Sequence, residues 1–201
     1  MLELKKIAVT GGLSAGKTTV CQVFKELGAY VISADEIVHQ LLSLGTDIAK
    51  QVIHLLGPDI IDGKELNRSK IAAKVFSKPE LLAALEKIIH PAVFDEIEQH
   101  YKQASTEKKH PLFIAEIPLL FEAEGETHFD CIISVESAEN LCRQRFEKQT
   151  HLPPQEFDQR MNRQIAPKLK TSRAHYTIQN NGTLEQLKQN VKTLYTQLTQ
   201  V

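Results

Sequence analysis

The chain has 201 residues and a formal net charge of −1 at pH 7, with 42% hydrophobic and 24% charged residues. These values are ordinary for a globular protein and leave room for one α/β domain with a small appended lobe. The near-neutral charge argues against a general nucleic-acid binder, because the affinity of such a protein rests on many phosphate contacts.

The apolar runs and the cysteines indicate the kind of protein and its cellular compartment. No segment approaches the ~18 apolar residues that a membrane span needs, and the amino-terminal apolar run is too short for a signal peptide. The three cysteines, Cys21, Cys131 and Cys142, show neither a metal-ligand spacing nor a C-x-x-C pair. We therefore expect thiols of a reducing compartment and a cytoplasmic enzyme.

The strongest motif lies near the amino terminus, where residues 7–19 contain the pattern G-x-x-x-x-G-K-[ST]. An apolar run over 7–9 predicts a buried strand before it, and apolar residues spaced by three and four predict a helix after it. The turn between them would direct backbone N–H groups at phosphate oxygens, with Lys17 and the helix dipole adding positive charge. The Thr18 hydroxyl is then placed to ligate Mg²⁺. A chance glycine-rich turn is the weaker interpretation, because strand and helix frame the motif correctly.

Residues 29–33 predict a second buried strand, and Asp35 follows at its carboxyl end. Ligands of open parallel sheets bind at the carboxyl ends of strands, so this carboxylate should face the same crevice as the phosphate loop. It could be a general base that accepts a proton from a substrate hydroxyl, or the N-cap of a helix over 36–42. Position alone leaves both interpretations open, and one residue could do both.

The middle section, residues 44–110, has an almost entirely helical pattern. Asn67 can cap a helix over 68–76. The next helix has a buried apolar stripe and is expected to break at His90-Pro91 and then to restart. In such a position His90 is more often a capping or buried structural residue than a functional one.

The second half of the chain predicts three more strands, over 110–116, 129–135 and 176–179, and a closing helix over 184–198. Glu116 ends the first of these strands, where a Walker B segment has an aspartate. This position predicts an indirect, water-mediated role with Mg²⁺.

An arginine-rich helical pair precedes the last strand. One helix is expected over 138–149, and Pro153-Pro154 opens the second. Such a late insertion predicts a mobile lid over the triphosphate, where arginines would stabilise the transferred phosphoryl group and exclude water. Alternatively, the basic residues of these helices could simply form a helical face that is exposed to solvent. The arginines of this region are Arg143, Arg145, Arg160 and Arg163.

Several further segments follow the phosphate loop in a fixed order. They are Ser33-Ala-Asp-Glu-Ile37, Leu66-Asn-Arg68, Leu85-Glu-Lys-Ile-Ile-His-Pro91, Ile117-Pro-Leu-Leu-Phe-Glu122, Arg160-Met-Asn-Arg-Gln164 and Ile178-Gln-Asn-Asn-Gly182. With this ordered set, the sequence resembles the dephospho-CoA kinase family from Ile7 to about Leu187. The loop motif alone is shared by many NTPases, whereas the Ile-Pro-Leu-Leu-Phe-Glu and Ile-His-Pro segments are far more specific.

The resemblance implies a three-layer P-loop nucleoside triphosphate hydrolase fold, with a five-stranded parallel sheet in a single domain over 1–201. A helical acceptor-binding insertion over about 36–108 and a helical lid over about 138–166 would interrupt this domain. The implied reaction is ATP-dependent phosphorylation of the ribose 3′-hydroxyl of dephospho-CoA, which gives coenzyme A and ADP in the final step of coenzyme A synthesis. ATP would be the co-substrate and Mg²⁺ the metal. We expect a monomer or weak homo-oligomer that binds neither nucleic acid nor membrane.

The resemblance also assigns roles by position. Asp35 looks like the base that orients and deprotonates the ribose hydroxyl, and Arg145 looks like the lid arginine that contacts the triphosphate. Arg68, His90 and Leu120 fall in segments near the acceptor pocket. The residues implied to surround the nucleotide phosphates are Thr10, Gly11, Gly12, Leu13, Ser14, Ala15, Gly16, Lys17, Thr18 and Thr19.

The sequence departs from the family pattern at two positions. The family usually has a second lid arginine where this chain has Gln149, next to Lys148, and a lysine cannot supply arginine's bidentate fork. The family also favours Ala-Asp before the last strand, where this chain has Ala174-His175.

Three other function classes compete with this interpretation. Another small-molecule P-loop kinase could act on a nucleoside, a nucleoside monophosphate or shikimate. A GTPase switch is disfavoured, because there is no D-x-x-G at switch distance and no N-K-x-D for guanine. A degenerate, non-catalytic nucleotide-binding regulator is supported only by Gln149 and His175, and Asp35 with Lys17 and Thr18 argues against it.

Overall fold

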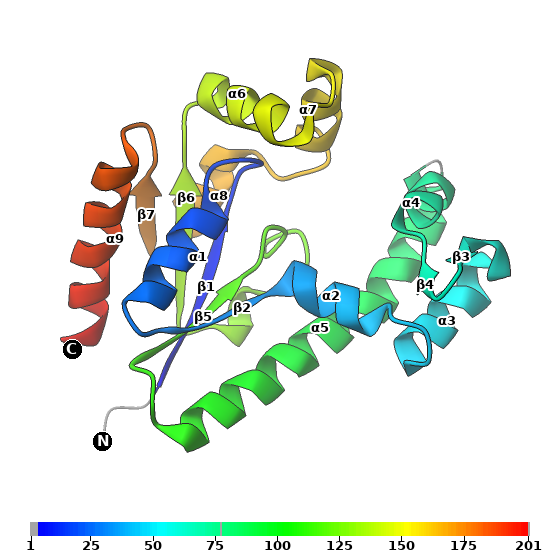
Figure 1. Cartoon of the computed structure of the whole chain (residues 1–201), viewed down its shortest axis with the longest axis horizontal. Helices are drawn as coiled ribbons and strands as arrows, with labels where there is room; N and C mark the ends of the chain where they lie inside the picture. Colours follow the sequence, from blue (N-terminus) through cyan, green and yellow to red (C-terminus); the bar gives the residue numbers. More distant parts are fainter. Residues whose placement is uncertain (1–3, 77, 201) are drawn as a thin grey trace. The chain divides into compact units, whose positions relative to one another are not determined.

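A computed structural model describes residues 4–76 and 78–200 of the chain. It divides into two compact units (Figure 1). The first combines the chain up to Ser33 with the chain from Tyr101 onward, and the second is Ala34–His100. No helix within the described ranges is both long and apolar enough to cross a bilayer.

The first unit contains a five-stranded sheet in the order β2-β5-β1-β6-β7. Each neighbouring pair of strands is parallel, which confirms the predicted five-stranded parallel sheet. Parallel strands covered on both faces read as continuous apolar runs, and β1 and β5 are such runs. The strands are β1 (Lys5–Gly11), β2 (Tyr30–Ser33), β5 (Leu112–Glu116), β6 (Cys131–Glu136) and β7 (Tyr176–Gln179).

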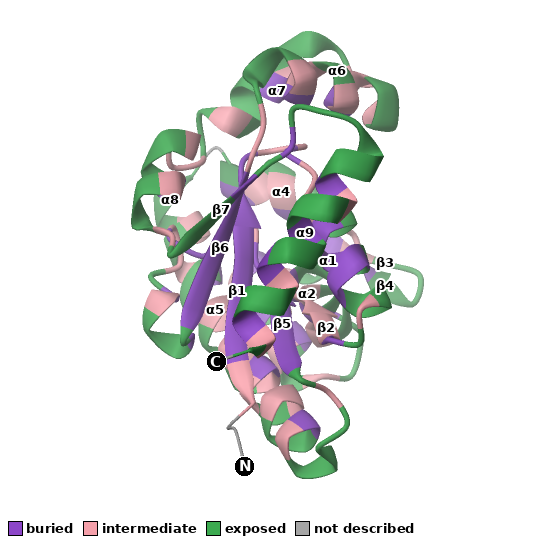
Figure 2. Ribbon diagram, turned by 90° about the vertical axis from the view of Figure 1, so that its left-hand side faces the viewer, coloured by how far each residue is buried: buried purple, intermediate pink, exposed green. Residues whose placement is uncertain are grey.

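Helices cover both faces of this sheet (Figure 2). On one face, α1 (Lys17–Glu26) and α9 (Leu184–Thr199) bury a core that contains Phe24 and Val191. On the other face lie α8 (Pro167–Arg173) and the end of α5, where Tyr101 packs edge-on against Phe113 with ring centroids 5.4 Å apart. The first unit also contains η2 (Glu126–His128), α6 (Glu139–Thr150) and α7 (Pro154–Met161).

The second unit is mainly helical and has its own apolar core, in which Val52 and Ile60 are fully buried. A short antiparallel hairpin joins its helices. Asn67 caps α4 as predicted, because its Oδ1 accepts the backbone N–H of Lys70 at 3.0 Å. The elements are α2 (Ala34–Leu41), α3 (Asp47–Leu56), η1 (Pro58–Ile60), β3 (Ile61–Asp62), β4 (Glu65–Leu66), α4 (Arg68–Phe76) and the part of α5 (Pro79–Glu107) that ends at His100.

The predicted break at His90-Pro91 is wrong. Helix α5 runs through Pro91 as one element of 29 residues. A proline inside a helix costs about 3 kcal/mol, whereas burying one Leu or Val side chain contributes about 1.5–3 kcal/mol. Leu85 before the proline and Val93 after it are both buried, so tertiary packing holds both halves in one helix.

The structure differs from the sequence-based prediction in two further local details. Helix α2 begins at Ala34, so Asp35 lies in its first turn and not at its N-cap. The short helix α8 and the β3–β4 hairpin were not predicted at all. Both are too short to show a helical or strand period in the sequence.

Candidate active site

The phosphate loop lies between β1 and α1 and depends on glycine at two positions. Gly11 has φ +143°, and a Cβ there would lie 2.3 Å from the carbonyl oxygen of Val135. Gly16 has φ +102°, and a Cβ there would lie 2.2 Å from Nδ2 of Asn180. A side chain at position 11 would collide with the backbone of Val135 and one at position 16 with the side-chain amide of Asn180, and both positions have a positive φ that L residues rarely adopt. The sequence motif therefore has a direct steric cause.

The amino end of α1 suits an anion. Gly16 is the N-cap and supplies no side-chain cap, and the first turn contains no acidic residue. The first N–H groups of a helix have no partner within it, and they meet the positive end of the helix dipole. An anionic ligand can therefore accept hydrogen bonds from this turn.

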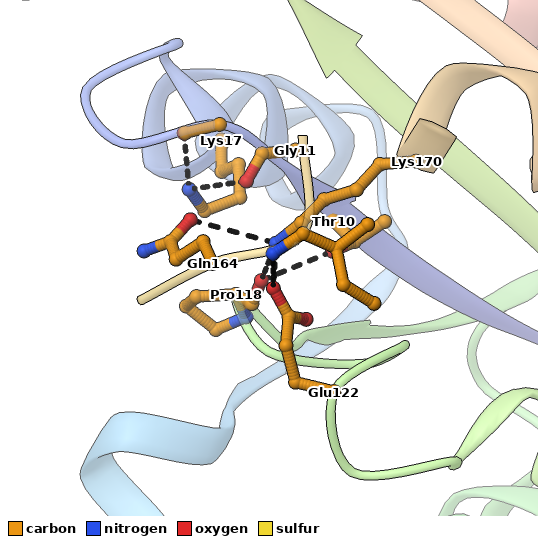
Figure 3. A network of polar contacts seen from close by, with 9 residues as sticks. Thr10, Gly11, Lys17, Pro118, Glu122, Gln164 and Lys170 are labelled. Carbon is orange, nitrogen blue, oxygen red and sulfur yellow. Dashed lines mark hydrogen bonds and ion pairs between the residues drawn. The ribbon is translucent and has the colours of Figure 1, made fainter. Parts of the chain in front are cut away.

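Lys17 turns back toward the loop that precedes it (Figure 3). Its Nζ donates to the carbonyl oxygens of Gly12 at 2.8 Å and Gly11 at 3.3 Å. The ammonium thus lies at the loop itself, where a phosphate group would meet it.

Thr18, the next residue, is linked to the end of β5. Its hydroxyl donates to Oε1 of Glu116 at 2.8 Å, and Glu116 is largely buried. Burial raises the pKa of the Cys21 thiol one turn further along α1, and the negative charge of Glu116 adds to this effect. The carboxylate therefore places negative charge beneath the first turn of α1, next to the ammonium of Lys17.

Thr18 and Glu116 are the residues that fit a magnesium ion. Both offer hard oxygen atoms, which Mg²⁺ prefers, and Mg²⁺ is usually held by one or two protein groups together with substrate phosphates. Within residues 4–76 and 78–200 there is no cluster of three or more His, Cys, Asp or Glu residues that could hold a metal by itself.

Arg145 lies on α6 and is held at the base of the predicted lid. Its Nη1 donates to Oγ of Ser137 at 3.0 Å, and its Nη2 donates to the carbonyl oxygen of Asn180 at 2.9 Å. The side chain of Asn180 in turn donates to the carbonyl oxygen of Ala15 in the phosphate loop at 2.8 Å. Asn180 is buried and received no role from sequence reasoning, because its contact joins residues 165 positions apart.

The two helices of the predicted lid are braced against each other. Phe146 on α6 meets Phe157 on α7 edge-on at 5.6 Å, and Arg143 lies over the Phe157 ring and forms an ion pair with Asp158. Arg160 lies over the ring of Phe146. Arg143 and Arg160 thus have structural partners within the pair.

A cavity of about 380 Å³ lies between the phosphate loop and the start of the lid and α8. Leu13 and Ala15 of the loop, Cys142 of α6, Phe157 of α7 and Pro167 of α8 contribute to its lining. It is a mostly apolar recess next to the loop backbone.

The second unit has a separate cavity of about 680 Å³. It brings Asp35 of α2 together with Arg68, the first residue of α4. Both side chains are exposed. The cavity is also lined by Glu36, His39, Asp62 and Glu65. Among the described residues that line it, Arg68 is the one arginine.

Two predicted acceptor residues, His90 and Leu120, do not line this cavity. His90 lies in α5 directly before Pro91, and it is not among the described residues that line this cavity. The side chain of Leu120 is fully buried in the first unit, so packing accounts for it.

The match to known families decides between the kinases that share such a loop. The family model for dephospho-CoA kinase matches residues 5–186 of the chain. The chain belongs to the dephospho-CoA kinase family.

A curated relative agrees with this assignment, and two solved structures share the fold. A dephospho-CoA kinase from Protochlamydia amoebophila is 50% identical over 199 residues, which cover 98% of each chain. A crystal structure of a Thermus thermophilus protein matches with a TM-score of 0.83 and 28% identity, over 98% of this chain and all of that one. The dephospho-CoA kinase from Campylobacter jejuni has the same fold, with a TM-score of 0.72 at 23% identity over 96% of both chains. The chain is therefore a nucleotide-binding transferase of coenzyme A biosynthesis.

The structure accounts for one of the two departures from the dephospho-CoA kinase pattern. Nδ1 of His175 accepts the backbone N–H of Ile132 at 3.0 Å, and the His175 N–H donates to the Ile132 carbonyl oxygen at 2.9 Å. An imidazole that accepts through Nδ1 carries its proton on Nε2. The histidine thus fixes the start of β7 against β6. Gln149 is exposed near the end of α6, and nothing in the structure explains its replacement of an arginine.

Proposed function

We propose that this kinase transfers the γ-phosphoryl group of ATP to the ribose 3′-hydroxyl of dephospho-CoA, giving coenzyme A and ADP. The observation that supports it most is the uncapped amino end of α1 beside Lys17, in a chain that aligns with a named dephospho-CoA kinase over 98% of its length.

The phosphate loop would hold the nucleotide. Backbone N–H groups at the start of α1 would bind phosphate oxygens, and Lys17 would exchange its bonds to Gly11 and Gly12 for the β- and γ-phosphates. Thr18 and Glu116 would hold Mg²⁺, whose chemistry when bound is to neutralise charge between these two phosphates. The remaining loop residues, from Thr10 to Thr19, would surround the same phosphates.

Asp35 would act as the general base in the second unit. Its carboxylate would accept the proton of the 3′-hydroxyl while the bond from the 3′-oxygen to the γ-phosphorus forms and the bond from that phosphorus to the bridging oxygen of ADP breaks. Arg68 lines the same cavity, and its guanidinium would bind a phosphate group of the acceptor. His90 is proposed only as a neighbour of this pocket.

Arg145 would contact the triphosphate without leaving its present partners. A guanidinium has five N–H donors, and the bonds to Ser137 and Asn180 use one on each of two nitrogens. The remaining donors can stabilise charge on the transferred group. The segment over 138–166 would then act as a lid that excludes water.

A panel of acceptors tests the proposed reaction. ADP release is measured in a coupled assay with ATP, Mg²⁺ and either dephospho-CoA, adenosine, AMP or shikimate. We expect rapid ADP release only with dephospho-CoA. Equal or faster release with another acceptor would reject the substrate, and release that is independent of any acceptor would reject the kinase reaction.

The cellular setting is also part of the proposal. We infer a cytoplasmic enzyme that is a monomer or a weak homo-oligomer and requires no nucleic acid. All three cysteines are buried, unpaired thiols, as is usual in a reducing compartment. Light scattering across a concentration series tests the oligomeric state.

A further inference from the structure

Lys170 on α8 is a fully buried lysine, with 0% of its side chain exposed. Its Nζ contacts three acceptors: Oε1 of Glu122 at 2.8 Å, the carbonyl oxygen of Pro118 at 2.9 Å and Oε1 of Gln164 at 3.5 Å (Figure 3). An ammonium group has three N–H donors. The three contacts thus use its whole donor capacity.

The pair of Lys170 and Glu122 is a costly way to fill a core. Lys170 is fully removed from water and Glu122 mostly so, which is unfavourable for both charges, and apolar residues of similar volume often stabilise such a place equally well or better. Oε2 of Glu122 is buried and receives no hydrogen bond from any residue that the structure describes. The charge of this carboxylate is therefore compensated mainly by Lys170, and stability alone is a poor reason for the pair.

The acceptors of Lys170 belong to segments that serve the phosphate loop and the lid. The Pro118 carbonyl oxygen also accepts the hydroxyl of Thr10 at 3.3 Å, and Thr10 directly precedes Gly11. Oε1 of Glu122 also accepts the backbone N–H of Ile165 at 2.9 Å. Lys170 thus joins the residues after β5 to both the start of the phosphate loop and the end of the predicted lid.

The amino end of α8 lies next to the phosphate loop. A Cβ placed on Gly12 would lie 3.4 Å from Cγ of Pro167, the first residue of α8. The carbonyl oxygen of Gly12 is the nearer acceptor of Lys17. A shift of α8 would therefore reach the loop at the residue that holds the catalytic lysine.

We propose that Lys170 is a positioning residue for the nucleotide site. Through Pro118 and Glu122 it fixes α8, the entry to the phosphate loop and the last residues of the lid in one arrangement. Its loss then weakens ATP binding by more than the accompanying loss of stability explains. The inference rests on the proposed function only in taking ATP as the phosphoryl donor.

A pair of variants separates positioning from stability. Lys170→Met leaves the half-buried carboxylate of Glu122 without its charged partner, and we expect a clear fall in Tm. The double variant Lys170→Met with Glu122→Gln removes both charges, and its Tm should recover most of that loss. Both should bind ATP roughly tenfold more weakly by calorimetry, because the acceptors Pro118 and Gln164 lose their donor in each. KM for dephospho-CoA should stay at the wild-type value.

Lys6→Met is the matched control. Lys6 is another buried lysine, on the face of the sheet that α8 covers. It lies at the opposite end of β1 from the phosphate loop, near the rings of Tyr101 and Phe129. This variant should lose stability and keep the wild-type Kd for ATP.

The double variant decides the outcome. If the double variant recovers its Tm and binds ATP with wild-type affinity, the inference is overturned, and Lys170 and Glu122 serve only packing. A tenfold loss in Lys6→Met would do the same, because any buried lysine would then have the effect. Failure of the wild-type enzyme to phosphorylate dephospho-CoA would reject the proposed function instead, and the calorimetric comparison of ATP binding would still stand.

Discussion

The hydroxyl of Thr18 donates a 2.8 Å hydrogen bond to Oε1 of Glu116. This bond joins the first turn of α1 to the last residue of β5, the strand that pairs with β1 in a register that sets Val9 opposite Glu116. Because the hydroxyl points its O–H at the carboxylate, its oxygen lone pairs stay directed away from Glu116. A threonine held in this way can offer oxygen to a metal ion.

Glu116→Gln tests this arrangement. The amide keeps the size of the side chain but removes its charge, so Mg²⁺ should be held less well, and we expect the Mg²⁺ concentration for half-maximal activity to rise roughly tenfold. Glu107→Gln, an equal change at the exposed end of α5, is the control and should leave it unaltered. An unchanged Mg²⁺ requirement in Glu116→Gln would remove the carboxylate from the metal site.

Asp35→Asn tests the general base. Asparagine cannot accept the proton of the acceptor hydroxyl, so kcat should fall by roughly 10²–10⁴ with only a modest change in KM for ATP. Glu36→Gln is a matched control, because Glu36 is the next residue of α2 and lines the same cavity. Turnover at the wild-type rate in Asp35→Asn would discard the assignment, and an equal fall in both variants would indicate a general effect of charge in the cavity.

Asn180→Ala tests the hydrogen bond that the β7–α9 turn makes to the phosphate loop. Without the amide, the Ala15 carbonyl oxygen loses its 2.8 Å donor, and the loop gains freedom that ATP must restrict on binding. We expect KM for ATP to rise roughly tenfold, as the loss of one buried hydrogen bond predicts. The control is Asn190→Ala on the exposed face of α9, and equal ATP affinity in both variants would argue against a role for Asn180.

The cysteines provide a test of burial. Desolvation raises the pKa of the Cys131 thiol to about 11, and burial also raises the pKa values of Cys21 and Cys142. A raised thiol pKa means less reactive thiolate at pH 8. Ellman's reagent should therefore react slowly with the native protein and release three equivalents only in denaturant. Rapid reaction of all three thiols in the native state would contradict the packing of this core.

The sequence predicted the fold where local pattern and packing agree. The phosphate loop follows from glycines that alone fit at positions 11 and 16, and the parallel strands follow from runs that are apolar on both faces. Pro91 predicts a helix break that the structure lacks, because buried residues on either side of it hold the helix together.

The site was predictable only in part, for a similar reason. Lys17 and Thr18 come from one contiguous motif, whereas the contacts of Lys170 and Asn180 join segments far apart in the chain. Helix α8 is short and mostly polar, so no period in the sequence indicates that one of its lysines is buried. The family resemblance implies that both Asp35 and Arg68 serve the acceptor, and the folded second unit brings them to one cavity.

Identification of the reaction product tests the central claim most directly. The wild-type enzyme is incubated with ATP, Mg²⁺ and dephospho-CoA, and the phosphorus NMR spectrum of the mixture is followed beside that of Lys17→Ala. We predict that a 3′-phosphomonoester signal grows in step with ADP, and that neither grows with Lys17→Ala. ADP without a new phosphomonoester, or a phosphate on another hydroxyl, would contradict it.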